Sequence, residues 1–434
     1  MKDSLSTASF ELRRNLSHSL LPENSRSMEA ERMLVVKKFG GTSVANKERI
    51  YNVARRCIEE YQKGNDVVVV LSAMGKMTDE LIELAKSVNP NPSKREMDML
   101  FTTGEQTSVA LMAMAMAALG VPAISLNAFQ VAMHTTSNYG NARLKRIDTE
   151  RIRHELESRK IVIVTGFQGI NKYDDYTTLG RGGSDTTAVA LAAALRADKC
   201  EIYTDVDGVY TADPRIVKTA KKLDEITYDE MLDLATLGAG VLHNRSVEMA
   251  KKYGVQLVVR SSLTNEEGTT VKEDVKVERM LVSGVAVDKS AERISVVGLA
   301  DKPGTAFRLF DALAKANINV DMILQSVGRD NSKDITFTVD GNCGEEALKV
   351  IEEAKARLNY QHVEIEKNVC KVSVVGAGMM SNPGVAAKMF ECLYNEHINI
   401  KMISTSEIRV TVLIDVNEAE RAANAIHDIF GLAE

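Results

Sequence analysis

The chain has 434 residues, of which 44% are apolar and 26% are charged, and its formal net charge is −6. This composition is typical of a globular protein of about two to four domains, and the acidic balance argues against a broad nucleic-acid surface. No apolar run approaches the roughly 20 residues that a membrane span needs, so no membrane partner is expected.

The cysteine and histidine patterns give no sign of a metal site. The five cysteines are scattered without a CxxC pair, which argues against zinc and against disulfides and favours a reducing compartment, the cytoplasm. Residues 1–32 lack the apolar core of a signal peptide and carry acidic residues, which transit peptides avoid. We expect this segment to be a flexible extension outside the fold.

From Val35 to about Arg260, short β-branched runs alternate with amphipathic or alanine-rich segments. The runs expected to form buried strands are Val67–Leu71, Ala123–Leu126, Ile161–Val164, Glu201–Thr204 and Gln256–Val259. Continuous apolar strands separated by helices predict an α/β fold with a mainly parallel central sheet. Ligands of such sheets gather beyond the carboxyl ends of the strands.

The first apolar run, Met33–Val36, leads into Lys38–Ser43, which reads KFGGTS. Its glycines let the backbone approach an anion, the helix start that follows supplies free N–H groups, and the lysine adds a mobile charge. We therefore predict a phosphate-binding turn. The spacing matches neither the P-loop nor the dinucleotide motif. A plain strand-to-helix turn with a surface lysine is the alternative.

Four further segments place polar groups at expected strand ends or helix starts. Ser72–Asp79 also suits an ordinary loop, and Thr102–Glu105 also suits the start of an alanine-rich helix. In Thr178–Thr187, glycines surround an arginine whose planar guanidinium suits a carboxylate or a phosphate. Thr204–Arg215 carries Asp-Gly and Asp-Pro turns without calcium-loop spacing, which favours contact with a nucleotide. Together these segments suit phosphoryl transfer, which needs charge neutralisation and positioning.

The last third of the chain contains an internal repeat. Pro303–Gly304 recurs as Pro383–Gly384, and Asn317–Ile323 recurs at the same offset as His397–Ile403. Each unit reads as a ferredoxin-like βαββαβ unit. The second unit lacks a final strand, and an open sheet edge needs a partner. We predict that the spare run Leu281–Val287 completes its sheet, so that the first unit is inserted within the second.

The motifs KFGGTS, TTGE, GRGGSD, TDVDGVYTADPR and VRSS, in this order, resemble those of aspartate kinases in the amino-acid kinase superfamily. The repeated units, with DKPG and NINVDMI, resemble ACT domains. The resemblance implies an amino-acid-kinase domain at 33–275, a first ACT domain at 292–367, and a second made of 276–291 and 368–434. It also implies transfer of the ATP γ-phosphoryl group to the β-carboxylate of L-aspartate. The product, 4-phospho-L-aspartate, would begin lysine, threonine and methionine biosynthesis.

Matching positions suggest roles for individual residues. Lys38 would neutralise the transferring phosphoryl group, and Asp185 would orient the lysine and the substrate. Arg181 would hold the α-carboxylate of aspartate, and Glu105 its α-ammonium group. Further positions near the substrate are Ser72, Thr78 and Phe167. Positions for the phosphates and the nucleotide are Gly40, Gly41, Thr42, Ser43, Gly182, Gly183, Ser184, Thr204, Asp205, Tyr210 and Arg215. Mg²⁺ would be held mostly by the ATP phosphates and water.

The ACT units imply feedback by an end-product amino acid, lysine or threonine. The matching positions are Asp301, Gly304, Thr305, Ala306, Asn319, Val320 and Asp321. Asp321 would hold an ammonium group of the effector, whereas Lys401 occupies the matching position of the second unit and would repel it. We therefore expect the effector on the first unit, facing a unit of another subunit in a homodimer or larger oligomer. A solvated strand-end carboxylate is the alternative interpretation of Asp321.

Two segments depart from the family pattern. The family often has GAKVLHPR where this chain reads GAGVLHNR, so that Gly240 replaces a lysine near the ATP phosphates and Asn244 replaces a proline. Lys218 is a candidate substitute. Asn127–Gln130 departs from the usual Thr-Gly-x-Gln. The loss at Gly240 raises the alternative of a catalytically weak amino-acid sensor. A kinase for another amino acid is a second alternative, which TTGE and the paired ACT units disfavour.

Overall fold

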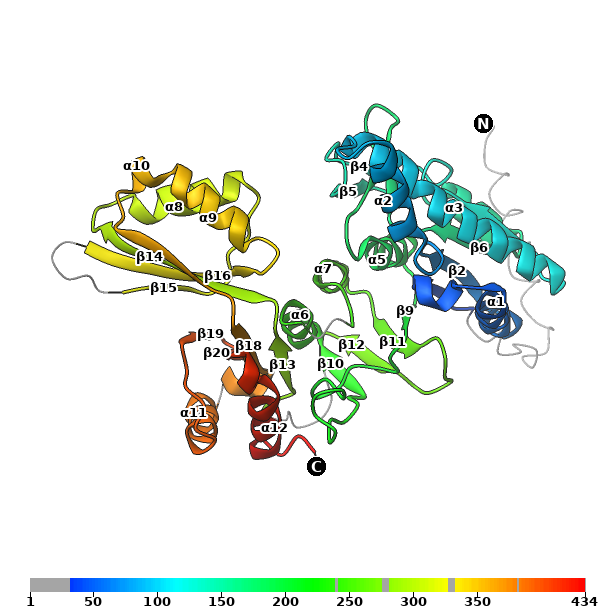
Figure 1. Ribbon diagram of the computed structural model, residues 1–434. Coiled ribbons are helices and arrows are strands. Elements are labelled where there is room, and N and C mark those ends of the chain that lie inside the picture. Colours follow the sequence, from blue (N-terminus) through cyan, green and yellow to red (C-terminus); the bar gives the residue numbers. More distant parts are fainter. Residues whose placement is uncertain (1–31, 239–240, 275–280, 327–331, 381, 434) are drawn as a thin grey trace, which may run out of the picture.

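The computed structural model describes residues 32–238, 241–274, 281–326, 332–380 and 382–433 (Figure 1). The expected N-terminal extension lies outside these residues except for Arg32.

An eight-stranded sheet forms the centre of the first part of the chain, in the order β10-β12-β11-β9-β1-β2-β6-β3 (Figure 1). All neighbouring strands are parallel except β11 and β12, which confirms the expected sheet. The strands are β1 (Leu34–Phe39), β2 (Asp66–Leu71), β3 (Ala123–Leu126), β6 (Ile161–Thr165), β9 (Lys199–Thr204), β10 (Glu225–Thr227), β11 (Leu257–Ser261) and β12 (Thr269–Lys272).

Helices cover both faces of this sheet because its apolar strands alternate their side chains between two cores. In β2, Val67 and Val69 join a core with one helix layer, and Val68 and Val70 join a core with the other. The first layer is α1 (Lys47–Gln62) and α3 (Lys94–Ala118), against which α2 (Met77–Val88) packs. The second layer is α4 (Glu150–Glu157), α5 (Gly183–Leu195), α6 (Tyr228–Thr236) and α7 (Asn244–Tyr253).

A smaller sheet in the order β5-β4-β7-β8 lies next to α3. Its strands are β4 (His134–Thr135), β5 (Leu144–Arg146), β7 (Gln168–Ile170) and β8 (Tyr176–Thr178). The chain leaves β8 directly into the glycine-rich segment that precedes α5, so this sheet holds one end of that segment.

The last third forms two ferredoxin-like units. The first has the sheet order β15-β16-β14-β17 and contains β14 (Ala291–Ala300), α8 (Thr305–Lys315), β15 (Ile323–Gln325), β16 (Ser332–Asp340), α9 (Gly344–Glu353), α10 (Lys355–Leu358) and β17 (His362–Glu366). The second has the order β13-β18-β20-β19 and contains β13 (Gly284–Asp288), β18 (Val369–Val375), α11 (Val385–Asn395), β19 (Met402–Thr405), β20 (Arg409–Asp415) and α12 (Ala419–Ile429). β13 pairs with β18, as the sequence predicted, from Gly284 opposite Val375 to Asp288 opposite Lys371.

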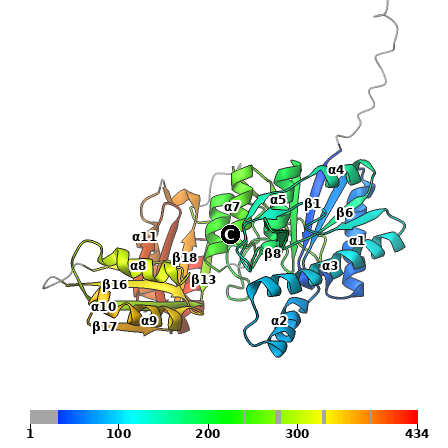
Figure 2. The same ribbon diagram turned by 90° about the horizontal axis from the view of Figure 1, so that it is seen from above.

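The second unit is attached to the kinase part through α6 (Figure 1). One carboxylate oxygen of Glu230 accepts hydrogen bonds from Ser283 Oγ at 2.7 Å and from the N–H of Ala377 at 2.9 Å. Arg409 of β20 lies 3.5 Å from Asp233 of the same helix. Figure 2 shows the two units side by side at one end of an elongated molecule. Helix α6 is therefore a structural link between the sheet and the C-terminal units.

Candidate active site

A lysine and an aspartate form an ion pair at the carboxyl edge of the central sheet. Lys38 is the residue before the end of β1, and its Nζ lies 2.5 Å from Asp185 Oδ1 in the first turn of α5. The two side chains are 12% and 13% exposed, so both charges are accessible to a small ligand. The structure thus brings together the two residues that the sequence places in catalytic positions.

The backbone around this pair is packed so closely that only glycine fits. A Cβ at Gly41 would lie 2.6 Å from the carbonyl oxygen of Ala73. Gly182 has a φ of +68°, and a Cβ there would lie 2.2 Å from the ring of His243. Gly182 is the N-cap of α5 and offers no capping side chain. The N–H of Gly183 donates to the carbonyl oxygen of Gly180 at 3.0 Å, so an anion at this helix terminus would meet the N–H groups that follow it in the first turn.

Glu105 supplies a buried carboxylate at the same edge. Its Oε1 accepts a hydrogen bond from the N–H of Ala73 at 3.3 Å. Its Oε2 is buried and has no hydrogen-bond partner among the described residues. Burial raises the pKa of Glu105 to about 7, and the hydrogen bond from Ala73 offsets part of that shift. A cationic group that bound Oε2 would both satisfy this oxygen and ionise the carboxyl.

The expectation that Thr102–Glu105 starts a helix is wrong. Helix α3 begins at Lys94, where Ser93 accepts a hydrogen bond from the N–H of Glu96, so Glu105 lies in the middle of the helix. Glycine is needed at position 104 because a Cβ there would lie only 2.9 Å from the Cβ of Ala73, which is closer than two such atoms approach. The small residue lets α3 approach the turn after β2. Glu105 therefore reaches the sheet edge through close packing and not through a helix terminus.

Other polar atoms at this edge also lack hydrogen-bond partners within the described part of the chain. They are Ser43 Oγ, Thr165 Oγ1 at the end of β6, and Nδ1 of His243. Burial lowers the pKa of His243, and the carboxylate of Asp185 offsets part of this shift. Unsatisfied buried polar atoms are rare in folded proteins and gather where ligands bind. The contact of His243 with Gly182 has no local signature in the sequence.

The remaining predicted substrate positions surround the same edge on different segments. Ser72 follows β2, and its carbonyl oxygen accepts a hydrogen bond from Ser108 Oγ at 2.9 Å. Thr78 lies in the first turn of α2. Phe167 has a φ of +70°, and its N–H donates to Thr187 Oγ1 at 3.1 Å. Arg181 is exposed in the turn before α5. Gly40, Thr42, Gly183 and Ser184 lie in the turns after β1 and at the start of α5.

A cavity of about 580 Å³ lies beside this edge. It is lined by the four predicted nucleotide residues, which are Thr204, Asp205, Tyr210 and Arg215, and by Val285–Val287 and Ala423. Tyr203 of β9 pairs with Phe39, the last residue of β1. The next residue of β9, Thr204, lines the cavity, so the cavity starts at the sheet edge where the strand that carries Lys38 ends. Its volume is within the usual range for pockets that bind small organic ligands.

The predicted effector positions fall on two separate parts of the first ACT unit. Asp301, Gly304, Thr305 and Ala306 follow the end of β14, where Ala300 pairs with Ser332. Asn319, Val320 and Asp321 precede β15, and the N–H of Asp321 donates to the carbonyl oxygen of Thr338. Ser332 and Thr338 are about 20 Å apart along β16 at the usual rise of a strand. One amino acid cannot contact both groups within one chain.

The two ACT units carry opposite charges at matching positions. Asp321 of the first unit lies 2.7 Å from Lys371 of the second, and Lys401 of the second forms an ion pair with Glu366 of the first. In each unit this position therefore forms an ion pair with the other unit, through a carboxylate in the first unit and an ammonium group in the second. A ligand with an ammonium group would compete with Lys371 for Asp321.

Comparisons with known proteins agree with these observations. The amino acid kinase family matches residues 33–261, and the ACT domain family matches residues 294–354 and 372–430. The aspartokinase of Bacillus sp. (strain MGA3) is 53% identical over 401 residues, which cover 92% of this chain and 98% of that protein. Aspartokinase 2 of Bacillus subtilis is 52% identical over 402 residues, with the same coverage. The chain belongs to the aspartokinase family.

A solved aspartokinase has the same architecture. Aspartokinase III of E. coli in complex with aspartate and ADP, in the R-state, has a TM-score of 0.78 at 27% identity, covering 91% of this chain and 99% of that one. The same enzyme in complex with lysine and aspartate, in the T-state, has a TM-score of 0.73 at 28% identity and the same coverage. The kinase sheet and the two ACT units are thus those of an aspartokinase.

The departures from the aspartokinase pattern have different outcomes. Gly240 lies outside the described residues. The side chain of Lys218 donates to the carbonyl oxygens of Pro214 and Arg215, at 3.3 and 3.2 Å, so it lies beside the cavity-lining loop. Asn127 and Gln130 exchange two hydrogen bonds between side chains and backbone N–H groups, which close a tight turn.

The described residues hold no group of three or more His, Cys, Asp or Glu side chains arranged to bind a metal ion. Within the same residues, no helix combines the length and the hydropathy that crossing a membrane requires.

Proposed function

We propose that this aspartokinase transfers the γ-phosphoryl group of ATP to the β-carboxylate of L-aspartate and produces 4-phospho-L-aspartate and ADP, the first step of lysine, threonine and methionine biosynthesis. The observation that carries the proposal is the Lys38–Asp185 pair next to the partnerless oxygen of Glu105. The complex of E. coli aspartokinase III with aspartate and ADP supports the choice of substrates.

Aspartate binding is assigned to groups of complementary charge. Glu105 receives the α-ammonium group on Oε2, and Arg181 receives the α-carboxylate. Ser72, Thr78 and Phe167 complete the walls of this site. The burial of Glu105 supports its role, because a carboxylate with one partnerless oxygen gains most from a cation. This clamp fixes the distance to the β-carboxylate and thereby favours aspartate over glutamate.

In the transfer step, a β-carboxylate oxygen attacks the γ-phosphorus of ATP. A new oxygen–phosphorus bond forms, the bond to the bridging oxygen of the β-phosphate breaks, and that oxygen leaves with its electron pair as ADP. Both reactants are anionic, so Lys38 lowers the barrier by neutralising charge on the transferring group. Asp185 holds the Lys38 ammonium at 2.5 Å and so directs it. The backbone N–H groups of Gly40, Gly41 and Gly182 add further hydrogen-bond donors for the phosphate oxygens.

The nucleotide is assigned to the cavity of about 580 Å³ lined by Thr204, Asp205, Tyr210 and Arg215. Mg²⁺ keeps water ligands and binds phosphate oxygens, so it does not need a cluster of protein ligands, and the part of the chain that the structure describes holds none. The ion would supply charge neutralisation at the phosphates. The side chain of Lys218, next to the same loop, would add positive charge that a lysine at position 240 provides in relatives.

Feedback by lysine is proposed through the first ACT unit and is supported by the lysine complex of E. coli aspartokinase III. The two groups of effector positions lie about 20 Å apart along β16, so a joint site needs a second copy of the chain. This supports a homodimer or larger oligomer. We keep the domain limits proposed from the sequence, which are 33–275, 292–367, and 276–291 with 368–434. A cytoplasmic location is proposed from the five free cysteines.

The test is an ADP-release assay with MgATP and L-aspartate, with L-glutamate or no amino acid as controls. We expect ADP release that depends on aspartate. Release with glutamate alone would favour a kinase for another amino acid, and lysine binding without any turnover would favour a sensor. Adding lysine, threonine or methionine to the same assay identifies the effector, and Asp321→Ala is expected to weaken inhibition without abolishing activity.

A further inference from the structure

The second ACT unit forms one wall of the nucleotide cavity. Val285–Val287 on β13 and Ala423 on α12 line it opposite the Thr204–Arg215 loop of the kinase domain. Ala212 and Val217 also belong to the hydrophobic core of the second unit. The loop is therefore packed between the kinase sheet and this unit, and its conformation depends on both.

Thr211 is the point at which this loop is most tightly held. Its N–H donates to the carbonyl oxygen of Lys221 at 2.8 Å, and its own carbonyl oxygen accepts from the N–H of Val285 at 2.7 Å. Its Oγ1 accepts from the N–H of Lys221 at 2.9 Å and lies 2.9 Å from Nε2 of His427. Thr211 directly follows Tyr210, so a displaced Thr211 would move a residue that lines the cavity.

His427 reaches this threonine from α12, near the end of the chain. The imidazole is fully buried, and burial lowers its pKa, which favours the neutral ring. Its Nδ1 has no hydrogen-bond partner among the described residues, and Asp428 Oδ1 lies 3.9 Å away. The contact with Thr211 is thus the polar contact that orients the ring. Asn424, on the same helix, donates to the carbonyl oxygen of Ile216 at 3.2 Å.

We propose that His427 is a positioning residue for the nucleotide. Through Thr211 it holds the cavity-lining loop in its binding conformation, so that the second ACT unit sets the affinity for MgATP. The inference rests on the proposed function, because it takes the cavity to be the nucleotide site. It follows that a displacement of α12 relative to the kinase sheet changes nucleotide binding and leaves the aspartate clamp at Glu105 in place.

Steady-state kinetics of four variants test this role: Thr211→Val, Thr211→Ser, His427→Leu and the double variant Thr211→Val/His427→Leu. We expect Thr211→Val and His427→Leu each to raise the KM for MgATP about tenfold, the effect of one lost buried hydrogen bond. The KM for aspartate and kcat should change less than about twofold. Thr211→Ser keeps the hydroxyl and should retain the wild-type KM. The double variant should be no worse than Thr211→Val, because Thr211→Val already removes the contact with His427; it also removes the acceptor of the Lys221 N–H, which His427→Leu keeps.

The matched control is Thr411→Val. Thr411 is also a buried threonine, and its Oγ1 lies 2.8 Å from Ser373 Oγ inside the sheet of the same unit, away from the loop. It should lose stability as Thr211→Val does and keep the KM for MgATP. An unchanged KM in Thr211→Val, or an equal rise in Thr411→Val, would overturn the inference. If His427→Leu does not fold, the Thr211→Val and Thr211→Ser pair decides. Absence of aspartate-dependent ADP release by the wild type would instead refute the proposed function.

Discussion

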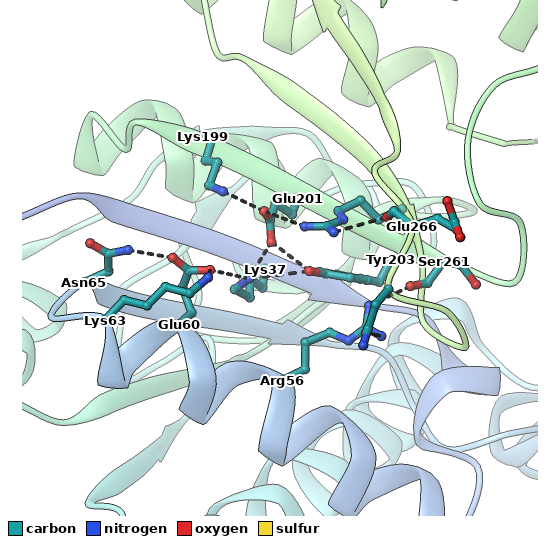
Figure 3. A network of polar contacts seen from close by, with 12 residues as sticks. Lys37, Arg56, Glu60, Lys63, Asn65, Lys199, Glu201, Tyr203, Ser261 and Glu266 are labelled. Carbon is teal, nitrogen blue, oxygen red and sulfur yellow. Dashed lines mark hydrogen bonds and ion pairs between the residues drawn. The ribbon is translucent and has the colours of Figure 1, made fainter. Parts of the chain in front are cut away.

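Lys37 and Lys38 are consecutive residues of β1, and their side chains lie on opposite faces of the central sheet. Lys37 is 2% exposed and lies 2.5 Å from Glu201 Oε2 and 3.2 Å from Glu60 Oε2 (Figure 3). Burial alone lowers the pKa of Lys37, but Glu201 and Tyr203 raise it above its ordinary value. Lys38 pairs with a single carboxylate, Asp185, among the described residues, and it lies at the carboxyl edge of the sheet.

The difference shows how a buried charge is recognised as structural or as functional. Around Lys37 each carboxylate has more than one cationic or amide partner: Glu201 also pairs with Lys199 at 2.8 Å (Figure 3) and with Arg260 at 3.6 Å, and Glu60 also accepts from Asn65. Burial raises the pKa of Glu201, but Lys37 and Lys199 lower it to about 2. At the sheet edge that carries Lys38, by contrast, Oε2 of Glu105 has no hydrogen-bond partner within the described ranges of the chain. Satisfied charges fix the sheet, whereas unsatisfied ones mark where a ligand completes the set.

The largest expected effect is that of Lys38→Met. Loss of the cation at the transferring phosphoryl group should lower kcat by roughly 10³-fold or more. Thermal unfolding should change little, because the side chain is not part of a core. The matched control is Lys47→Met, an exposed lysine at the start of α1. A kcat within about tenfold of the wild type would remove Lys38 from the transfer step.

Lys37→Met should show the opposite pattern. It leaves Glu60 and Glu201 buried with fewer partners, which costs about 3 kcal/mol of unfolding free energy in urea titrations. The kcat of the folded fraction should remain within about twofold of the wild type. Adding Glu201→Gln removes one of the two buried carboxylate charges that have lost Lys37 and should recover part of the stability. A fall in kcat like that of Lys38→Met would mean that both lysines serve catalysis.

Sequence reasoning could find the fold because its signals are local or repeated. Continuous valines indicate β2, and two matching segments with one offset indicate the paired units and the β13–β18 pairing. The same reasoning placed Lys38 at a strand end, where alternation puts it on the face opposite Lys37. It missed the start of α3, although Ser93 followed by Glu96 is a helix-start pattern.

Long-range contacts could not be predicted in this way. Nothing near Thr211 indicates that His427 lies against it, and nothing near Gly182 indicates the ring of His243. Such contacts depend on how whole units pack, and no spacing or periodicity records them. The polar atoms that remain unsatisfied after packing, such as Glu105 Oε2, become visible only in the structure.

Glu105→Gln should separate binding from stability. In the ligand-free protein the pKa of this buried carboxyl is raised from 4.5 to about 7. The folded state therefore holds the proton more tightly, and the stability of the wild type falls as pH rises from about 4.5 through about 7. Glutamine carries no such charge, so the variant should have the higher thermal midpoint at pH 8.

The same variant should bind aspartate more weakly at pH 8, although it is the more stable protein there. An ionised Glu105 is needed for the α-ammonium group, so the wild-type KM for aspartate should fall as pH rises through about 7. In Glu105→Gln the KM should be about tenfold higher at pH 8 and should lose this pH dependence. A KM that titrates equally in both proteins would assign the pH dependence to another group.

The smallest effect is expected at the margin of the Lys37 cluster. Lys63 is 67% exposed, and its Nζ lies 3.6 Å from Glu60 Oε2, which already accepts from Lys37 at 3.2 Å (Figure 3). Solvent screens an exposed pair of this kind, so Lys63→Ala should change the unfolding free energy by less than about 0.5 kcal/mol. Urea titrations at low and high salt measure it. Glu60 is thus stabilised mainly by the buried Lys37. If Lys63→Ala lost as much unfolding free energy as Lys37→Met, the number of charges around Glu60, and not their burial, would determine the stability of this cluster.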